Sequence, residues 1–258
     1  MSRQSRRNDI VAYIKAHGYV SFNDLKTRFP DVSEITLRID LKELGDQNKI
    51  IRLRGGAKPV QEEARPDDSY FLRTTRNLEP RQRIARKAVE YLKAQLAQKP
   101  TVSIFLDAGV TINEIAKIFP DEWCTIVTNG IANAYELAAL KRPSIIVLGG
   151  TLNRYNCNCD SVSNIDVLER LNFDMAFIPA AAYSPETGFT CGKEVIDEIR
   201  DIIKKHSKKV IVPLDSSKFG MVYPVTHLKI SEVDMIITDD DLPPEMEAHF
   251  KEMGVEVL

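Results

Sequence analysis

The chain has 258 residues, of which 43% are hydrophobic and 28% charged, a length that suits one large domain or a small domain joined to a medium one. No stretch approaches the ~18 uninterrupted apolar residues of a membrane helix, and no apolar region follows the basic N-terminus as it would in a secretory signal. The four cysteines fit neither a disulfide framework nor paired zinc knuckles, so we expect a cytoplasmic protein without a membrane segment.

The net charge of −2 conceals an uneven distribution along the chain. Residues 1–58 hold 12 Lys and Arg against 7 Asp and Glu, a net charge of +5, whereas residues 59–258 hold 23 against 30, a net charge of −7. A basic N-terminal module on an acidic body indicates that the small part binds a polyanion and the large part does not.

The N-terminal module, residues 1–57, is predicted to contain three helices. Apolar residues at helical spacing predict a first helix that ends near His17. Ser21 and Asp24 have the spacing of a capping box, which starts a second helix. The third helix is expected over Ser33–Leu44, with Ser33 as its cap. Such a module is typical of a winged helix-turn-helix, whose recognition helix enters the major groove of DNA.

The third helix has two distinct faces. One narrow arc, which must face the core, carries Leu37, Leu41 and Leu44. The opposite arc carries two isoleucines and two cations, a combination unusual for a purely solvated surface. In the major groove the isoleucines could touch thymine methyl groups while the arginine reads a base or holds a phosphate; alternatively, the isoleucines cover a neighbouring element such as the wing. The candidate DNA-binding residues of this helix are Ser33, Ile35, Thr36, Arg38, Ile39 and Lys42.

A short basic β pattern, Lys49–Arg54, follows the third helix and ends at Gly55-Gly56. This pattern predicts a wing hairpin whose Arg52 and Arg54 lie near the phosphate backbone. Such contacts add affinity and salt dependence but little sequence information.

Residues 58–79 combine two prolines with mixed charges and no sustained period, which predicts a linker. Pro80 then starts a long helical pattern that reaches about Gln98. From Thr101 onward short apolar runs alternate with helical stretches, so we expect an α/β domain over 80–258 with a mostly parallel, doubly wound sheet.

Seven strands and five further helices are predicted in this domain. The strands are Val102–Leu106, Thr125–Val127, Ile145–Leu148, Met175–Ile178, Val210–Val212, Met235–Thr238 and Val255–Leu258. The helices are Thr111–Ile118, Ile131–Ala139, Ile165–Leu171, Lys193–His206 and Pro244–Met253.

Small and polar residues follow several of these strands. In a doubly wound sheet the carboxyl ends of the strands meet at one edge, where ligands bind. Glycines let a ligand approach the backbone, a helix N-terminus favours an anion, and the polar side chains suit hydroxyl groups. The pattern predicts a pocket for a sugar phosphate or a similar anionic polyol. Its candidate residues are Asp107, Gly109, Thr111, Asn129, Gly149, Gly150, Asp215 and Lys218.

The sequence resembles the DeoR family of bacterial regulators, which typically show a V-S-x-x-T-[IL]-R-R-D-L helix and a G-G-A after the wing. The N-terminal module carries Tyr19-Val-Ser-Phe-Asn-Asp-Leu25, Val32-Ser-Glu-Ile-Thr-Leu-Arg-Ile-Asp-Leu41 and Arg52-Leu-Arg-Gly-Gly-Ala57. The large domain carries Phe105-Leu-Asp-Ala-Gly-Val-Thr111, Thr128-Asn129, Leu148-Gly-Gly150 and Asp215-Ser-Ser-Lys-Phe-Gly220, which look like the effector domain of that family.

The resemblance implies a fold and a mechanism. The effector domain of the family is similar in fold to ribose-5-phosphate isomerase and the CoA transferases. The implied function is a homo-oligomeric repressor, dimeric or tetrameric, of a carbohydrate-utilisation operon. Such a repressor binds double-stranded operator DNA and leaves it when a phosphorylated sugar binds; it needs no other cofactor.

Several positions depart from the family pattern. Ile39 stands where the second arginine of the R-R-D motif is usual, and Asp40 is interpreted as a structural ion-pairing residue. Residues Ile178–Ala182 replace a glycine-containing stretch, and no Lys-Arg pair follows Glu194. These departures bear on the operator sequence and on the choice of effector.

Three other functions remain open. A sugar-phosphate isomerase with a DNA-binding appendage would need a positioned acid/base pair, for which Asp107 is a candidate base. A metal site could use Cys157 and Cys159 with Cys191 or Asp160, although free thiols are commoner in such a loop. A helix-turn-helix could also bind another protein, against which the basic wing argues.

Overall fold

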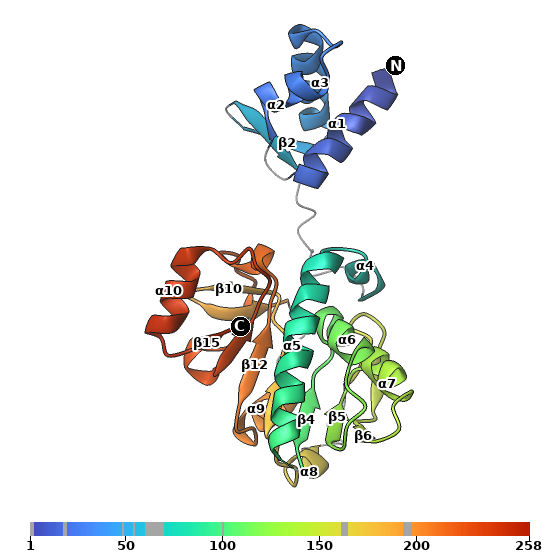
Figure 1. The fold of residues 1–258 in the computed structure, drawn as a ribbon, viewed down its shortest axis with the longest axis vertical. Helices are drawn as coiled ribbons and strands as arrows, with labels where there is room; N and C mark the ends of the chain where they lie inside the picture. The colour runs from blue at the N-terminus through green and yellow to red at the C-terminus, as the bar shows by residue number, and fades with distance from the viewer. Residues whose placement is uncertain are drawn as a thin grey trace. The chain divides into compact units, whose positions relative to one another are not determined.

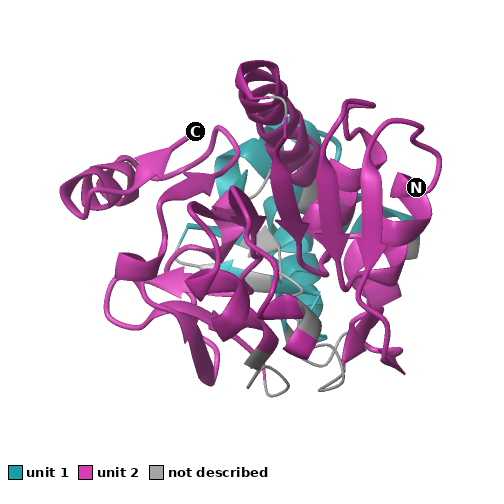
Figure 2. Cartoon of the chain, turned by 90° about the horizontal axis from the view of Figure 1, so that it is seen from below, with its two compact units in different colours: residues 1–65 teal, residues 66–258 magenta. Residues whose placement is uncertain are grey.

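The computed structural model describes residues 3–17, 20–47, 49–53, 55–59, 70–99, 101–160, 165–192 and 198–258. The chain divides into two compact units, residues 1–65 and residues 66–258 (Figure 2). The division falls within the segment 58–79, which the sequence predicts as a linker. No helix among the described residues is both long enough and apolar enough to cross a membrane.

The described residues of unit 1 form three helices and a small antiparallel sheet of strand order β1-β3-β2. Its elements are α1 (Arg3–His17), β1 (Val20–Ser21), α2 (Phe22–Arg28), α3 (Glu34–Asp46), β2 (Ile50–Leu53) and β3 (Gly56–Pro59). The three predicted helices and the wing hairpin are confirmed. The strand β1 was not predicted, because two residues are too short to show a period; it pairs Val20 with Ala57 and so fastens the wing to α2.

The predicted helix caps of unit 1 are confirmed. The Ser21 hydroxyl accepts a hydrogen bond from the Asp24 backbone N–H at 3.2 Å, and the Asp24 carboxylate accepts one from the Ser21 N–H at 2.9 Å. The Ser33 hydroxyl accepts one from the Thr36 N–H at 3.2 Å. The three leucines of α3 are buried, as predicted, in one core with Ile10 and Ile14 of α1.

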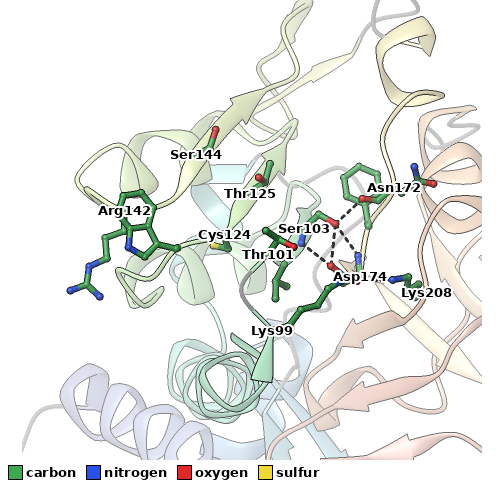
Figure 3. Close-up of a pocket in the computed structure, with 13 residues that line it drawn as sticks. Lys99, Thr101, Ser103, Cys124, Thr125, Arg142, Ser144, Asn172, Asp174 and Lys208 are labelled. Carbon is green, nitrogen blue, oxygen red and sulfur yellow. Dashed lines mark hydrogen bonds and ion pairs between the residues drawn. The ribbon is translucent and has the colours of Figure 1, made fainter. Parts of the chain in front are cut away.

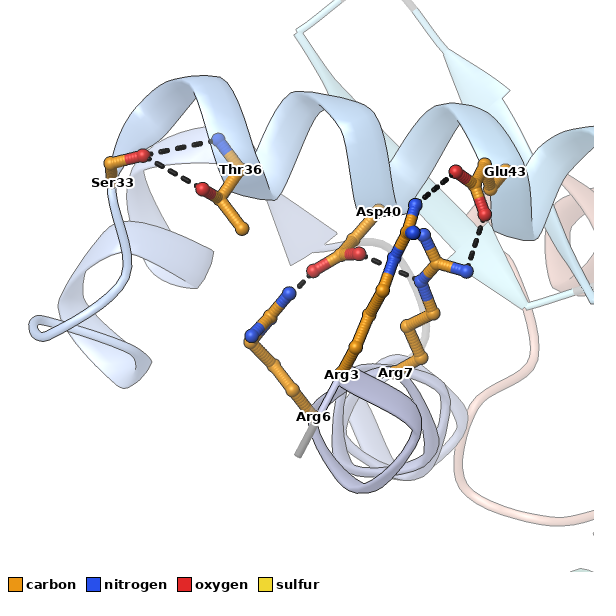
Figure 4. A network of polar contacts seen from close by, with 7 residues as sticks. All are labelled: Arg3, Arg6, Arg7, Ser33, Thr36, Asp40 and Glu43. Atoms are coloured by element: carbon orange, nitrogen blue, oxygen red, sulfur yellow. Dashed lines mark hydrogen bonds and ion pairs between the residues drawn. The ribbon is translucent and has the colours of Figure 1, made fainter. Parts of the chain in front are cut away.

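A buried carboxylate joins α1 to α3 (Figure 4). Asp40 is 1% exposed and accepts hydrogen bonds from Arg6 Nε at 2.6 Å and from Arg7 Nε at 2.7 Å. Arg3 and Arg7 also pair with Glu43, one turn further along α3. Burial raises the pKa of Asp40, but the two guanidinium groups outweigh burial and hold the pKa below its usual value. The structural role predicted for Asp40 is confirmed.

We predict that Asp40→Asn lowers the stability of unit 1 by about 3–5 kcal/mol, because it leaves two arginines beside a buried neutral group. The ion pairs contribute fully above the unfolded carboxyl pKa of about 4 and are lost as the pH falls toward the lower folded value. Thermal unfolding from pH 7 to pH 2 should therefore show a smaller acid dependence in the variant. Asp31→Asn, at an exposed position of the same unit, is the control, and an equal loss in both variants would contradict the prediction.

Unit 2 is an α/β domain. Its helices are α4 (Tyr70–Thr74), α5 (Leu78–Gln98), α6 (Val110–Lys117), α7 (Ile131–Leu137), α8 (Ile165–Leu168), α9 (Glu198–Lys205) and α10 (Pro244–Glu252). Its strands are β4 (Ser103–Leu106), β5 (Thr125–Thr128), β6 (Ser144–Val147), β7 (Thr151–Asn153), β8 (Asn158–Asp160), β9 (Met175–Phe177), β10 (Ala182–Ser184), β11 (Gly188–Cys191), β12 (Val210–Pro213), β13 (Val225–Leu228), β14 (Met235–Ile237) and β15 (Glu256–Val257).

Seven of these strands form one sheet in the order β15-β14-β12-β9-β4-β5-β6, and every pairing in it is parallel. All seven were predicted from their apolar runs. The chain leaves β4 toward β5 and β6, then returns to the other side of β4 with β9, β12, β14 and β15. The direction in which the chain adds strands to the sheet therefore reverses between β4 and β9. Folds of this kind bind ligands in a crevice at the carboxyl ends of the strands that flank such a reversal.

Helices cover both faces of the sheet, as the doubly wound prediction requires. Helices α5, α6 and α7 lie on one face (Figure 1), where Ile84, Ile115 and Leu137 join one core. Helices α8, α9 and α10 contribute Leu168, Ile203 and Phe250 to a second core. Strand β4 divides its side chains between them, with Phe105 in the second core and its two neighbours in the first.

Two antiparallel groups were not predicted. Strands β7 and β8 form a hairpin, and β10, β11 and β13 form a three-stranded sheet that packs on the second core. Their strands have three or four residues, which is too few for a clear alternation. The long helix begins at Leu78, two residues before the predicted Pro80, and a short helix lies within the predicted linker at Tyr70–Thr74. Of the predicted helix Lys193–His206, residues 193–197 lie outside the described residues, and α9 is described from Glu198.

Candidate DNA-binding helix and effector site

The outer face of α3 is open to solvent. Ile35 is 72% exposed and Ile39 is 46% exposed, and Arg38 and Lys42 beside them are also exposed. The alternative that the two isoleucines cover a neighbouring element of unit 1 is therefore wrong. Two large apolar side chains in water cost free energy that a partner surface could recover. The exposed stripe fits an insertion into the major groove.

Arg38 is held in place by an aromatic ring. Its guanidinium lies over the ring of Phe22, the first residue of α2, at 4.3 Å from the centroid. A cation over an aromatic face gains about 0.5–1 kcal/mol at exposed sites and loses conformational freedom. Ser33 caps the same helix, and its hydroxyl lies 2.9 Å from the hydroxyl of Thr36 in the first turn (Figure 4). These hydroxyls therefore stabilise the N-terminus of α3, which is the end that contacts bases in helix-turn-helix proteins.

The wing places Arg52 on the edge of the module. Strands β2 and β3 pair in antiparallel register, with Arg52 opposite Ala57. The Arg52 side chain runs over Gly45 of α3, where an added Cβ would lie 2.8 Å from Arg52 Cδ. Its exposed position suits a phosphate contact. Arg54, the second predicted wing cation, lies outside the described residues.

We predict that Ile39→Arg changes the operator sequence that the protein selects, because a bidentate arginine favours guanine where an apolar contact favours thymine. Selection from a random DNA library by the purified chain measures the change at a single position of each half-site. Ile118→Arg is a matched control, since Ile118 is also 46% exposed but lies in unit 2. If the wild type and Ile39→Arg select identical sequences, Ile39 does not contact a base, and the prediction that this face of α3 lies in the major groove is contradicted.

The predicted effector residues of unit 2 all lie at the carboxyl edge of the parallel sheet. Asp107, Gly109 and Thr111 follow β4, Asn129 follows β5, Gly149 and Gly150 follow β6, and Asp215 and Lys218 follow β12. The strand order brings the first four beside the change of direction between β4 and β9. The two glycines end the edge strand β6 and lead into the β7–β8 hairpin.

Asp107 is the centre of a buried polar network. It is 1% exposed, and its Oδ1 accepts hydrogen bonds from the Ala108 N–H at 2.7 Å and from Asn129 Nδ2 at 3.0 Å. Its Oδ2 accepts one from Arg200 Nε at 2.7 Å. Both carboxylate oxygens therefore have protein partners. Asp107 positions Asn129 and Arg200 at the edge of the sheet, which is a different task from binding a hydroxyl group itself.

Asn129 has an unused acceptor in this network. The residue is 1% exposed, its Nδ2 donates to Asp107, and its Oδ1 has no hydrogen-bond partner among the described residues. A buried carbonyl oxygen without a partner costs roughly 1–3 kcal/mol, which a ligand hydroxyl group or an ordered water would recover. Asn133 Nδ2 fixes the same loop through the Asp107 carbonyl oxygen at 3.0 Å.

Gly109 is required by packing at the start of α6. A Cβ at this position would lie 2.9 Å from Pro179 Cγ, in the loop that follows β9. The loops after β4 and β9 thus touch where the sheet changes direction. Thr111, in the first turn of α6, is 8% exposed. By contrast, a Cβ at Gly149 would meet no atom within 4 Å, so protein packing does not explain that glycine.

The loop after β12 presents Asp215 and Lys218. Asp215 is 5% exposed, and its Oδ1 accepts hydrogen bonds from Asn77 Nδ2 at 3.2 Å and from the Ser217 hydroxyl. Lys218 ends a short 3-10 helix, and its ammonium forms no ion pair with a described carboxylate. Burial lowers the pKa of Lys218; Asp215 opposes that shift, whereas Arg81, Arg76 and Arg73 add to it.

Three residues of this edge were missed by sequence reasoning. Arg200 pairs with Asp107 across 93 positions of the chain, which no local pattern reveals. Arg81 is 3% exposed and lies on the buried face of α5 with Ile84 and Ala88, so a cation on an apolar stripe was the available signal. Asn77 has a φ of 47°, a left-handed conformation that asparagine tolerates better than most residues.

A cavity of about 510 Å³ lies at the opposite edge, beside the amino ends of β4, β5 and β6 (Figure 3). Its cations are already paired: Lys99 and Lys208 contact Asp174 at 2.6 and 3.0 Å, and Arg142 contacts Glu122. Asp174 also accepts a hydrogen bond from the Ser103 N–H, and it fastens β4 to the start of β9. We therefore assign the lining of this cavity to the stability of the sheet.

The cysteine loop does not form a metal site among the described residues, where no cluster of three His, Cys, Asp or Glu side chains could hold an ion. Cys157, Cys159 and Cys191 form no disulfide bond with a described residue. The Asp160 carboxylate accepts hydrogen bonds from Asn153 and Asn158 and thereby closes the β7–β8 hairpin.

We predict that Arg200→Gln lowers the stability of unit 2 by about 3–5 kcal/mol, because it leaves the buried Asp107 carboxylate without a cation. Arg142→Gln removes an ion pair whose two side chains are each 50% exposed and should cost less than about 1 kcal/mol. Urea unfolding of the full chain compares the two variants. Arg200→Lys, which keeps the charge, should recover part of the loss. Similar losses for both Gln variants would show that Arg200 contributes nothing specific.

Two protein-family models match the chain, one in each unit. Residues 6–63 match the model described as a DeoR-like helix-turn-helix domain. Residues 76–240 match the model described as a DeoR C-terminal sensor domain, which spans the carboxyl edge of the sheet.

Curated relatives align over most of the chain. An HTH-type transcriptional regulator GlpR of Haloferax volcanii is 33% identical over 227 residues, 88% of this chain and 86% of that protein. The glycerol-3-phosphate regulon repressor of Escherichia coli K12 is 29% identical over 248 residues, 94% of this chain and 93% of that protein. A solved structure of D-ribose-5-phosphate isomerase with phospho-erythronic acid covers 54% of this chain and 52% of its own, at 15% identity and a TM-score of 0.34. A likeness of that size decides nothing about function.

Proposed function

Because the chain belongs to the DeoR family of DNA-binding transcriptional regulators, we propose that it is a repressor whose operator affinity falls when a phosphorylated sugar or polyol binds at the carboxyl edge of its sheet. The family supplies the DNA-binding and sensor domains. The finer statements, namely the direction of regulation, the effector class and the residues, are supported by the geometry of the two units and by the names of two relatives.

The DNA-binding half of the proposal is supported by the exposed stripe on α3. Ile35 and Ile39 are apolar and open, Arg38 is preoriented on Phe22, and Lys42 extends the cationic edge. The two isoleucines suit apolar contacts with base edges, and the two cations suit phosphates and guanine. A protein-binding surface would not need the basic wing beside it.

The single observation that carries the effector half is Lys218. The Lys218 side chain is half-buried at the carboxyl edge and forms no ion pair with a described carboxylate. An anion bound there would pair with this ammonium. Asn129 Oδ1, an unpartnered acceptor at the same edge, suits a hydroxyl group. One ligand that offers both groups is a phosphorylated sugar or polyol, and the relative in Escherichia coli K12 is named for glycerol 3-phosphate.

The proposal includes a homo-oligomer, a dimer or a tetramer. Helix-turn-helix regulators place two recognition helices in successive major grooves, one helical turn apart, which a single chain cannot do. An effector that binds one arrangement of the linked domains more tightly than another would favour that arrangement. DNA affinity would fall if the favoured arrangement fits the operator less well.

The isomerase alternative is not favoured. The relatives are transcriptional regulators, and Asp107, the candidate base, has both carboxylate oxygens bound to protein groups. A general base must reach the proton that it removes, whereas Asp107 is 1% exposed and its carboxylate is tied to Arg200 and Asn129. The sensor domain is therefore proposed to bind its ligand without converting it.

The function is tested by binding and release. Purified full-length protein is screened by thermal unfolding against inorganic phosphate, glycerol 3-phosphate, and pentose and hexose phosphates, with the unphosphorylated compounds as matched controls. A compound at 100 times its Kd should stabilise the protein by about 2.7 kcal/mol. The same compound should weaken a mobility shift on DNA upstream of the neighbouring operon.

Lys218→Gln should lose the response to the phosphorylated compound and keep operator binding, whereas Lys205→Gln, at an exposed position of α9, should keep both. Three results would overturn the proposal: no DNA binding at low salt, no response to any phosphorylated compound, or turnover of such a compound by the protein.

A further inference from the structure

Several buried polar atoms at the carboxyl edge of the sheet have no hydrogen-bond partner among the described residues. The side chains that carry them include Tyr70, Asn113, Asn129, Asn158, His227 and Thr238, each in or beside a loop at that edge. Among the described side chains at the amino edge there is no such atom. A buried polar atom of this kind costs roughly 1–3 kcal/mol, which a ligand group or an ordered water would recover. One of these side chains, His227, has no part in the site described above.

The two ring nitrogens of His227 have different surroundings. Nε2 lies 3.2 Å from the carbonyl oxygen of Pro179, in the loop after β9. Because a carbonyl oxygen can only accept, Nε2 carries the proton and donates it to this bond. Burial, and after it the charge of Arg200, lower the pKa of His227 to about 4, so the ring is neutral at pH 7. Nδ1 is therefore a hydrogen-bond acceptor, and it is the ring nitrogen without a described partner.

Contacts from two directions connect His227 to the loop after β4. On one side its partner Pro179 packs against that loop, since a Cβ on Gly109 would lie 2.9 Å from Pro179 Cγ. On the other side the His227 carbonyl oxygen accepts a hydrogen bond from Lys204 Nζ at 3.4 Å. Lys204 lies one turn beyond Arg200 in α9, and Arg200 forms the ion pair with the loop after β4. His227 therefore belongs to the polar surroundings of the effector site.

Asn129 Oδ1 and His227 Nδ1 are associated with strands on opposite sides of β4. Asn129 follows β5 and His227 contacts the loop after β9, and both β5 and β9 pair with β4. Neighbouring strands are about 4.8 Å apart, so the ends of β5 and β9 lie about 10 Å from each other. One small anion cannot bridge that distance, whereas a carbon chain with separate polar groups can.

The chemistry of these two atoms selects the polar groups of the ligand. A neutral imidazole nitrogen and an amide oxygen both accept hydrogen bonds, so each needs a donor. Phosphate oxygens are acceptors and cannot meet this need, but hydroxyl groups can donate. The Nε2 contact with Pro179 explains how His227 holds the loop after β9, and it leaves Nδ1 for a second task.

We propose that His227 binds the effector, and that His227 Nδ1 and Asn129 Oδ1 each accept a hydrogen bond from a hydroxyl group of that ligand. This inference rests on the proposed function and narrows its ligand class to a phosphorylated sugar or polyol with at least two hydroxyl groups. The hydroxylated part of the ligand lies between the loops after β5 and β9, and the phosphate meets Lys218.

Two substitutions separate the two nitrogens of His227. His227→Gln keeps an amide nitrogen near the position of Nε2 and removes the acceptor at Nδ1, whereas His227→Asn keeps an amide near Nδ1 and loses the contact with Pro179. His227→Gln should bind the phosphorylated compound that stabilises the wild type about three- to tenfold more weakly. Its affinity for inorganic phosphate should not change. His227→Asn should bind the phosphorylated compound more tightly than His227→Gln. Titration calorimetry on the full chain measures all of these affinities.

The matched control is His206→Gln. His206 is half-buried like His227, but it follows α9 at the amino edge, where its carbonyl oxygen accepts from the Phe173 N–H. This variant should bind both compounds as the wild type does.

A second measurement uses the unaltered full chain with isotope-labelled histidine. The Nδ1 resonance of His227, identified by its absence in either His227 variant, should shift when the phosphorylated compound is added. Inorganic phosphate should not shift it, because a phosphate offers no hydroxyl donor.

Three outcomes decide the inference. Wild-type affinity for the phosphorylated compound in His227→Gln, or an unshifted Nδ1 resonance, would overturn it and leave the proposed function standing. An equal loss of affinity for the phosphorylated compound and for inorganic phosphate would show that His227 only holds the loop after β9, and would overturn it as well. Failure of the wild type to bind any phosphorylated compound would overturn both this inference and the proposed function.

Discussion

Parallel pairing of seven strands is the constraint on which the sensor domain depends. It brings every strand's carboxyl end to one edge, so residues far apart in sequence become neighbours there. The ion pair between Asp107 and Arg200 fixes this edge from within, because it ties the loop after β4 to α9 and orients Asn129. At the opposite edge, Asp174 pairs with Lys99 and Lys208, so these charges compensate one another.

The two edges differ in how their cations are compensated. Arg81 is buried and donates to carbonyl oxygens of the turn before α5, and Lys218 forms no ion pair with a described carboxylate. At the amino edge, by contrast, Lys99 and Lys208 pair with Asp174. This difference is the reason for proposing the anion site at the carboxyl edge.

The sequence is sufficient to predict the longer helices and the parallel strands, but not the polar contacts between residues far apart in the chain. The seven parallel strands have continuous apolar runs, and α3 separates its leucines from Ile35 and Ile39 by helical period alone. The short antiparallel strands and α4 lack enough residues for a period. Arg200 could not be assigned to Asp107, because 93 positions separate them and only the fold joins them. The strand-end glycines do lie at the carboxyl edge of the sheet, but Gly109 is explained by its contact with Pro179.

Hydrogen exchange of the full chain, with and without the phosphorylated compound that stabilises it, tests the central claim most directly, because slowed exchange reports local stabilisation along the backbone. The account predicts slower exchange at the loops after β4 and β12. Protection confined to the amino edge around Ser103 and Thr125, with no change at the loops after β4 and β12, would contradict it.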